Sequence, residues 1–236
     1  MKQAGDGTDT DTDADTDADT DAGEDEGKAQ SAVPGASAAG ATSPALRLLS
    51  VNVGRCERLR TGERSVLSAI GKKAVTHAVN VGRLGLEGDE QADLSIHGGL
   101  DKAVYAYPAV HYAFWQAQRR EHNVSLFDEE LPPGFVGENL TVDGLLEHEV
   151  YVGDRLHFPD CVLRVTAPRE PCFKFNAVMG FAQASRAMAL AGCCGYYLAV
   201  DQPGTIQVGQ SARLEPGSRG LGIAQAFAGK FAKHAR

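Results

Sequence analysis

The sequence lacks several features that would place it in a familiar class. It has no run of about eighteen apolar residues, which excludes a helix that spans a membrane. The GxGxxG and P-loop patterns are also absent, so the glycine-rich loops that bind dinucleotides or nucleoside triphosphates are not expected. The first residues resemble neither a secretory signal nor a transit peptide. We therefore expect a cytoplasmic protein with no membrane partner.

The spacing of the cysteines excludes a common structural role. No CxxC pair occurs and the adjacent pair lacks zinc-ligand spacing, so a structural zinc site is not expected. The number of cysteines is odd and the chain is not small, which indicates thiols in a reducing compartment rather than a disulfide framework. The five cysteines are Cys56, Cys161, Cys172, Cys193 and Cys194.

An excess of basic residues is missing as well. Residues 1–28 carry a net charge of −9, and the other 208 residues carry a net charge of +1. A nucleic-acid-binding protein would show a basic patch or stripe, so we expect no nucleic-acid partner. The overall charge of −8 thus describes one segment and not the part that folds.

That acidic segment defines the domain organisation. Its repeat TDTDTDADTDADTDAGEDEG has no aromatic residue and too little apolar surface to offset the entropy of ordering. An Ala/Gly/Ser-rich stretch follows and is typical of a linker. We predict a disordered acidic tail and linker over 1–45, a folded domain over 46–215 and a helical C-terminal extension over 216–236.

Short strands with glycine turns dominate the folded part. Alternating apolar residues predict strands over 46–54 and 74–84, and a glycine-rich loop over 85–102 precedes a strand over 103–107. A hairpin over 150–158 and 161–169 turns at Pro159–Asp160, and the last strands are 196–200 and 205–214. This pattern favours a mainly β (α+β) fold, namely a closed β-barrel with a few peripheral helices.

Three helices are predicted beside the strands. The first begins at Pro108, because proline is favoured in a first helical turn, and it runs to His122 with Val110, Phe114 and Ala117 on its apolar face. The second runs over about 178–191, ending at Gly192. The third, over 223–235, has apolar residues three and four apart and would pack on the surface of the domain.

Three loop clusters carry the residue types that chemistry needs. Each has an ordinary alternative, since a histidine, a capped turn or a pair of cations in a loop is often only a solvated surface feature. Together they suit a pocket for an anionic, phosphate-bearing ligand, in which a thiolate is either a nucleophile or a ligand to a soft metal. The candidates are His97, Asp101 and Lys102 in HGGLDKAVY (97–105), Glu138 and Asn139 in GENLT (137–141), and Arg169, Cys172 and Lys174 in PREPCFK (168–174).

Several strings in this order resemble the MOSC domain family, named for the C-terminal domain of molybdenum cofactor sulfurases. The likeness covers about residues 46–215 and is greatest to the stand-alone bacterial branch, which includes reducers of N-hydroxylated purines. The strings are VNVGR (51–55), LGLEGDEQADLSIHGGLDKAVYAYP (84–108), GENLT (137–141), VGDRL (152–156), PREPCFKF (168–175) and GYYLAV (195–200).

The resemblance implies a β-barrel that binds the pterin-based molybdenum cofactor. Its signature cysteine falls on Cys172, which would be the catalytic residue and a molybdenum ligand. The other candidates would bind the cofactor or substrate: Arg169 and Lys174 offset negative charge, His97, Asp101 and Lys102 face cofactor or substrate oxygens, and Glu138 and Asn139 bind the pterin edge. Family descriptions also mention pyridoxal phosphate, which belongs to a desulfurase domain that this chain lacks, so we do not expect it here.

The chain departs from the family pattern near its last strands. Relatives often carry cationic residues where this sequence has Gly192-Cys193-Cys194 and Leu198-Ala199-Val200. The departure puts tight binding of a phosphate end in doubt, or indicates another substrate. Cys193 and Cys194 would be either additional ligands or small buried residues.

The function that follows is a molybdenum-cofactor-dependent oxidoreductase that reduces N-hydroxylated compounds. No flavin or iron–sulfur motif is present, so a separate reductase would donate the electrons. Two alternatives remain open: a sulfur carrier that handles the cofactor through a persulfide on Cys172, and a cysteine hydrolase that uses Cys172 with His97. The oligomeric state is also open, with a homodimer among the alternatives.

Overall fold

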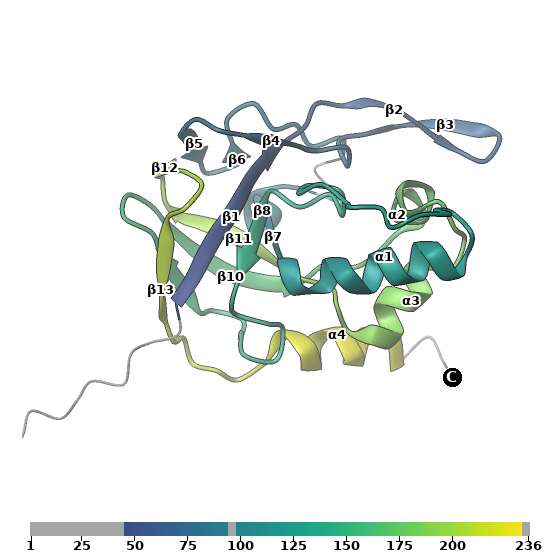
Figure 1. The fold of residues 1–236 in the computed structure, drawn as a ribbon. Helices are drawn as coiled ribbons and strands as arrows, with labels where there is room; N and C mark the ends of the chain where they lie inside the picture. The colour runs from purple at the N-terminus through teal and green to yellow at the C-terminus, as the bar shows by residue number, and fades with distance from the viewer. Residues whose placement is uncertain (1–44, 94–97, 233–236) are drawn as a thin grey trace, which may run out of the picture. The chain divides into compact units, whose positions relative to one another are not determined.

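Seven strands of the described residues close into a β-barrel, as the sequence predicts (Figure 1). The structure is a computed structural model that describes residues 45–93 and 98–232. Neighbouring strands are antiparallel except β7 and β8, which run parallel. Around the ring the strands are β1 (Ala45–Val53), β13 (Ser211–Glu215), β9 (Arg155–His157), β10 (Val162–Pro168), β11 (Tyr196–Gln202), β7 (Val104–Pro108) and β8 (Leu140–Asp143), which pairs with β1.

Strand β1 closes the barrel because it is long enough to pair with three other strands. It pairs with β13 near its start, with β8 through its middle and with β4 (Lys73–Val75) near its end. Leu46 and Leu48 point into the core, whereas Arg47 and Leu49 are exposed. The register with β8 shifts between Leu48 and Ser50, and such irregularities let a strand bend around a barrel.

The single strand predicted over 74–84 is wrong, because its two halves pair with different strands. Strand β4 extends the barrel sheet beside β1. Strand β5 (Val79–Gly82) instead joins a small sheet with β6 (Gly85–Leu86) and β12 (Gly204–Ile206). Residues 76–78, between β4 and β5, are exposed. The strand predicted over 205–214 divides in the same way, into β12 and β13.

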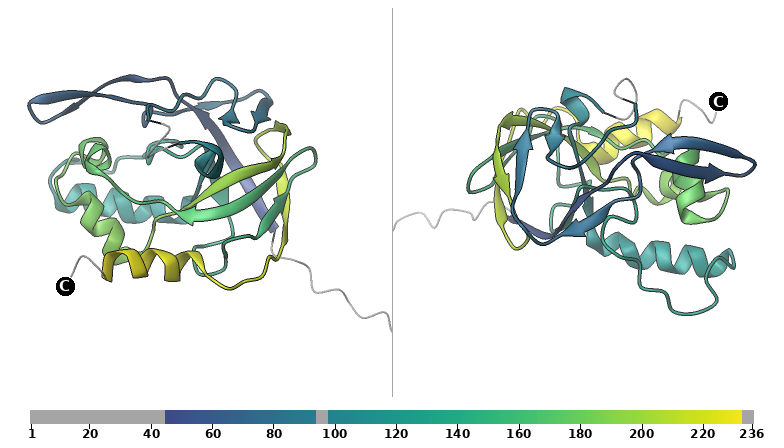
Figure 2. Two further views of the ribbon diagram at one scale, coloured as in Figure 1. Left: turned by 180° about the vertical axis from the view of Figure 1, so that it is seen from behind. Right: turned by 90° about the horizontal axis from the view of Figure 1, so that it is seen from above.

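A β-hairpin that the sequence analysis did not identify projects from the domain. Strands β2 (Glu57–Thr61) and β3 (Arg64–Ser68) are joined by Gly62 and Glu63, and Gly62 has a φ of 63°, which glycine adopts without strain. We call residues 57–68 the arm. Figure 2 shows the arm reaching over α2 (Phe173–Met179), and β2 contacts this helix.

The helix predicted over 178–191 is two helices in the structure. Helix α2 ends at Gly180, which is left-handed with a φ of 80°, and α3 (Ala184–Ala191) ends at Gly192, as predicted. A Cβ atom on Gly180 would lie only 2.6 Å from Val124 Cγ1. The break is therefore set by a contact with a distant part of the chain as well as by the conformational freedom of glycine.

The apolar face predicted for the helix after Pro108 is also wrong. Residues Ala109–His111 form a 3₁₀ turn, and α1 proper is Tyr112–Glu121, so the phase of the helix shifts. Trp115 and Arg119 are its buried residues, whereas Val110 is 66% exposed. The ring of Trp115 packs edge-on against Phe175 of α2, with the centroids 5.1 Å apart.

Helix α4 (Ile223–Ala232) follows the barrel and agrees with the third predicted helix over the described residues. Ile223 and Phe227 are buried, and the helix contacts β10 and α3. Its ten residues are far fewer than the roughly 20 that a membrane span needs. Within the described residues, no helix is long and apolar enough to cross a membrane.

Candidate functional site

A pocket of about 640 Å³, its open mouth included, lies where three barrel strands meet the loops that precede β4 and β8. Strands β7, β10 and β11 bring Tyr105, Arg169 and Tyr197 to its wall. The remaining wall comes from segments far apart in the chain, namely 68–72, 89–92, 137–139 and 172–174, together with Lys102. The pocket therefore unites residues from all three sequence clusters.

Cys172 lies in a turn between β10 and α2 and lines the pocket. Pro168 ends β10, and Cys172 has an extended backbone with φ −131° and ψ 175° directly before the helix. Its carbonyl oxygen accepts hydrogen bonds from the Phe175 amide at 2.9 Å and the Ser185 hydroxyl at 3.1 Å. These contacts hold the turn, and the half-buried thiol is left at the pocket wall.

Arg169 is a buried cation at the same wall, with 6% of its surface exposed. The guanidinium carbon lies 4.5 Å from the centroid of the Phe175 ring and 5.4 Å from that of Tyr105. Burial lowers the pKa of Arg169, but Tyr105, Tyr197 and Cys172 outweigh this effect, so its pKa lies above the ordinary value. Among the ion pairs of the described residues, none includes Arg169.

Two tyrosines beside Arg169 stay protonated. Burial raises the pKa of Tyr105 and of Tyr197, although the charge of Arg169 works against this in both cases. The Tyr105 hydroxyl donates to the Cys194 carbonyl at 2.8 Å, which fixes its ring under the pocket. Both tyrosines are therefore neutral beside the Arg169 guanidinium. Neither of them supplies a negative charge that would pair with this cation.

Lys102 and Lys174 add two cationic side chains to the lining. The Lys102 ammonium lies 5.6 Å from the centroid of the Tyr197 ring, a cation–π arrangement. The Lys174 ammonium donates to the Leu67 carbonyl at 3.0 Å, which ties α2 to the end of β3. Lys174 therefore stabilises the arm as well as contributing charge to the pocket.

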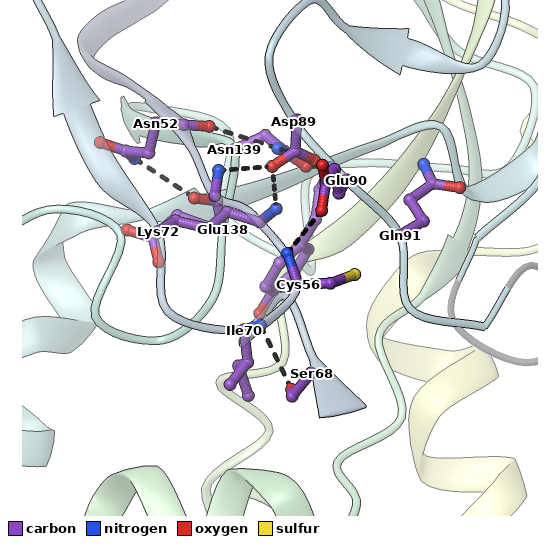
Figure 3. Close-up of polar contacts among 12 residues, drawn as sticks. Asn52, Cys56, Ser68, Ile70, Lys72, Asp89, Glu90, Gln91, Glu138 and Asn139 are labelled. Atoms are coloured by element: carbon purple, nitrogen blue, oxygen red, sulfur yellow. Dashed lines mark hydrogen bonds and ion pairs between the residues drawn. The ribbon is translucent and has the colours of Figure 1, made fainter. Parts of the chain in front are cut away.

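A buried ion pair in the lining was not anticipated from the sequence. Lys72 pairs with Asp89, and their side chains are 7% and 4% exposed. The Asp89 carboxylate also accepts hydrogen bonds from the Gly54 amide at 2.8 Å and from Asn139 Nδ2 at 2.9 Å (Figure 3). The two residues are 17 positions apart, and no motif links them. Only the folded barrel brings them together.

Asn139 lines the pocket but is also part of the barrel framework. Its Oδ1 accepts a hydrogen bond from the Tyr105 amide at 3.0 Å, and its backbone amide donates to the Tyr105 carbonyl at 2.8 Å. Its backbone carbonyl accepts a bond from the Asn52 amide at 2.7 Å. Asn139 thus joins the loop before β8 to β1 and β7.

The neighbouring Glu138 is fully buried and does not line the pocket. Its Oε1 accepts hydrogen bonds from the Gly134 amide at 2.8 Å, the Thr141 hydroxyl at 2.7 Å and the Tyr112 hydroxyl. Burial raises the pKa of Glu138, although these bonds oppose the shift. The carboxyl group folds the loop over 134–141, while Gly137 with a φ of 94° forms part of the pocket wall.

The other candidate residues lie apart from the pocket or outside the described residues. The Asp101 side chain is exposed and not part of the lining, and its carbonyl accepts a hydrogen bond from the Thr166 hydroxyl at 2.5 Å. His97 lies outside the described residues. The thiols of Cys193 and Cys194 are buried away from the pocket, and their carbonyls accept bonds from Tyr107 and Tyr105.

The lining has the chemistry of an anion site with one thiol. Guanidinium and ammonium groups bind phosphate and carboxylate oxygens, and glycine backbone lets a ligand approach closely. No cluster of three or more His, Cys, Asp or Glu side chains that could hold a metal ion by itself occurs among residues 45–93 and 98–232. A metal bound here would therefore arrive with other ligands, and Cys172 would be the thiol available to it.

Comparison with known proteins identifies the family. The sequence profile of the MOSC domain matches residues 93–213. The Bacillus subtilis protein named "Uncharacterized protein YflK" is 37% identical over 188 residues, which cover 79% of this chain and 80% of YflK. The chain belongs to the MOSC domain family.

Further relatives of this MOSC domain agree in sequence and in structure. "Protein YiiM" of Escherichia coli is 40% identical over 64% of this chain and 65% of YiiM. A Gibberella moniliformis protein named "Reductase" is 33% identical over 71% of this chain, which spans only 29% of that protein. The crystal structure of YiiM from Geobacillus stearothermophilus superposes with a TM-score of 0.63 at 29% identity, covering 81% of this chain and 86% of that one.

Only part of the pocket wall comes from residues that the MOSC profile matches. Lys102, Asn139, Arg169 and Cys172 lie within the matched residues, whereas Lys72 and Asp89 precede residue 93. The wall contributed by segments 68–72 and 89–92 is therefore outside the profile match. It nevertheless belongs to the same pocket, because Asp89 bonds to Asn139.

Proposed function

We propose that this MOSC protein binds the pterin-based molybdenum cofactor in the pocket and reduces N-hydroxylated compounds with electrons from a separate reductase. Membership of the MOSC family and the relative named "Reductase" support a redox role. The observation that carries the proposal is Arg169, a buried guanidinium without a carboxylate partner among the described residues, at the wall that holds Cys172.

The residues of the pocket fit an anionic cofactor. A buried, unpaired cation is costly unless a ligand supplies the opposite charge, so Arg169 favours a phosphate or another anionic group. Lys102 and Lys174 offset further negative charge at the mouth. Cys172 would ligate the metal as a thiolate, which soft metals prefer and which nearby cations favour.

The roles of the remaining residues follow from their contacts. Tyr197, which stays protonated beside Arg169, would donate a hydrogen bond to an anionic oxygen in the pocket. Asn139 and Asp89 hold the wall by bonding to each other. Glu138 would act on the shape of the wall and not on the ligand, because its Oε1 accepts bonds from its own loop and from Tyr112 of α1.

The overall reaction defines what the pocket must supply. Reduction of a hydroxylamine R–NHOH to R–NH₂ and water consumes two electrons and two protons. When bound, the molybdenum cofactor would supply a metal that accepts the N–O oxygen and exchanges electrons with the donor. The chain would bind and orient the reactants, and the electrons would come from a separate protein that carries its own redox cofactor.

Molybdenum analysis tests the proposal directly. The full chain and its Cys172→Ala variant would be purified from a host that makes the cofactor and from one that cannot. We expect near-stoichiometric molybdenum only in the wild-type protein from the first host, together with reduction of an N-hydroxylated purine by a chemical reductant. A Cys172→Ala protein that keeps both its molybdenum and its activity contradicts the proposal. The matched control is Cys193→Ala, which removes a thiol outside the pocket.

A further inference from the structure

A second, open groove lies between the arm and α2, next to the pocket. Its lining is apolar along Val66, Phe173 and Phe181, and it carries the arginines Arg60 and Arg64 but no acidic residue. Phe173 is 56% exposed although it is a large aromatic side chain. Neither arginine takes part in an ion pair between described residues. The groove therefore combines an exposed aromatic side chain with two arginines that have no ion-pair partner among the described residues.

The loop after α1 has the opposite character. Leu126 and Phe127 are 78% and 82% exposed, and Asp128, Glu129 and Glu130 follow them directly. Glu129 pairs with Arg119 and Asp128 pairs with Arg120 of the same chain. The loop therefore presents an exposed apolar pair close to Glu130, which matches an apolar groove that carries two arginines. We call residues 126–130 the acidic loop.

Hydrogen bonds hold the acidic loop in this orientation. Arg119 binds the Glu129 carboxylate through two bonds at 2.9 and 3.1 Å, and the Ser125 hydroxyl donates to the Phe127 carbonyl at 2.9 Å. The exposed side chains of Leu126 and Phe127 are thus presented by a fixed backbone. A surface fixed before binding loses less entropy when it associates.

The groove and the acidic loop lie at the same end of the domain (Figures 1 and 2). Arg119 also donates to the Met179 carbonyl at 2.7 Å, and Val124 packs against Gly180, which lines the groove. Two complementary surfaces side by side allow a two-fold axis to pass between them. Each loop then enters the groove of the other copy, and the pair closes without forming a chain.

We propose that this protein forms a two-fold homodimer in which the acidic loop of each copy occupies the groove of the other. Leu126 and Phe127 pack against Phe173 and its apolar neighbours. Glu130 faces Arg60 and Arg64 of the second copy, and Asp128, which pairs with Arg120 of its own chain, lies beside this contact. The proposal does not depend on the proposed reaction. It places the second copy beside α2, whose first residue directly follows Cys172.

Sedimentation velocity of the full chain over a range of concentrations tests the dimer. We expect a dimer whose dissociation constant rises at least tenfold in the double variant Leu126→Ser with Phe127→Ser. Leu190→Ser is the matched control, because Leu190 on α3 is 79% exposed and should leave the dimer unchanged. A wild-type protein that stays monomeric overturns the proposal, as does a dimer that survives the double variant.

Charge reversal tests which surfaces meet. The groove variant Arg60→Glu with Arg64→Glu and the loop variant Asp128→Arg with Glu130→Arg should each be monomeric, because like charges then face each other. Their mixture should form a heterodimer, since each groove again faces a loop of opposite charge. Thermal melting shows that both variants fold. Two folded monomers that do not combine overturn the proposal.

The groove could instead serve an acidic electron-donating protein, and the same variants separate this case. The groove variant would then lose activity with a protein donor but keep it with a chemical reductant, and the wild-type chain would show no dimer. That result overturns the homodimer and assigns the groove to the donor.

Discussion

The turn over 168–174 and the loop over 134–141 each bury one charged residue near the pocket, and the two charges have opposite uses. Glu138 Oε1 accepts three hydrogen bonds from its own surroundings. Arg169 has aromatic rings and a methionine sulfur around it but no carboxylate among the described residues. The comparison teaches that a buried ionisable group in a motif indicates a ligand contact when it lines the pocket, as Arg169 does, and not when the protein uses it to hold a loop, as it uses Glu138.

Removing the Glu138 side chain should give the largest loss of stability. Glu138→Ala leaves the Gly134 amide and the Thr141 hydroxyl without their acceptor, and leaves the Tyr112 hydroxyl with only its longer bond to the Pro132 carbonyl at 3.3 Å. We expect the free energy of unfolding to fall by about 3–5 kcal/mol, measured by urea denaturation. Glu138→Gln keeps an acceptor oxygen and should cost less than half as much. Equal losses in the two variants would mean that the hydrogen bonds do not hold the loop.

Removing Arg169 should have the opposite effect. Arg169→Leu eliminates a buried charge without leaving a carboxylate unpaired, so stability should change by less than about 1 kcal/mol in either direction. If Arg169 binds the cofactor as proposed, molybdenum content after expression in a cofactor-producing host should fall at least tenfold, because the phosphate of the proposed cofactor would lose its buried partner. The contrast between Arg169 and Glu138 is wrong if Arg169→Leu unfolds the protein while Glu138→Ala abolishes only the binding of molybdenum.

The pH dependence of stability should distinguish Glu138 from Glu147. Burial raises the pKa of Glu138, so the folded state holds this proton more tightly and stability falls as the pH rises above the ordinary glutamate value. Burial also acts on Glu147, but His111, 2.9 Å away, and the Gly195 amide outweigh it and lower the pKa. The contribution of Glu147 to stability is therefore lost as the pH falls below the ordinary glutamate value.

Urea midpoints at about pH 5 and pH 8 measure the slope for Glu138, and midpoints at about pH 3 and pH 5 measure the slope for Glu147. The stability of Glu138→Gln relative to the wild-type protein should improve from pH 5 to pH 8, whereas that of Glu147→Gln should worsen from pH 3 to pH 5. Slopes of the same sign in the two variants would contradict the assignment.

The smallest expected effect is a difference in reactivity among the thiols of the unmodified protein. Cys172 lines the pocket, whereas burial raises the pKa of Cys161 to about 11 and of Cys193 to about 12, and it raises that of Cys194 further. Alkylation of the folded protein should therefore modify Cys172 well before these three, as peptide mass spectrometry would reveal. Early modification of Cys193 would show that the wall near β11 opens.

Much of the barrel could be predicted because the responsible signals are local. Alternation in β1 and the Pro159–Asp160 turn between β9 and β10 depend on neighbouring residues in the sequence. The break at Gly180 could not be predicted in this way, because it depends on packing against Val124 from a distant loop. The arm has few apolar residues, so it carries almost no periodic signal.

The site shows the same limit. Arg169, Cys172 and Lys174 could be selected because they lie within six residues of one another, between the end of β10 and the first turn of α2. The pair of Lys72 and Asp89 could not, since Lys72 lies in no recognisable motif and meets Asp89, which lies in the string over 84–108, only across the barrel. The sequence also does not show whether the Glu138 carboxyl group points into the pocket or back into its own loop. In the structure it points back and accepts a bond from the Gly134 amide.

The position of Trp115 gives this protein a built-in optical probe. It is the only tryptophan in the chain, it is fully buried, and its Nε1 donates to the Tyr107 hydroxyl at 2.6 Å. Its ring packs against Phe175, which in turn packs under the guanidinium of Arg169. Emission from a single indole two side chains away from the pocket would therefore report ligand binding without any label, in the same titration that follows unfolding.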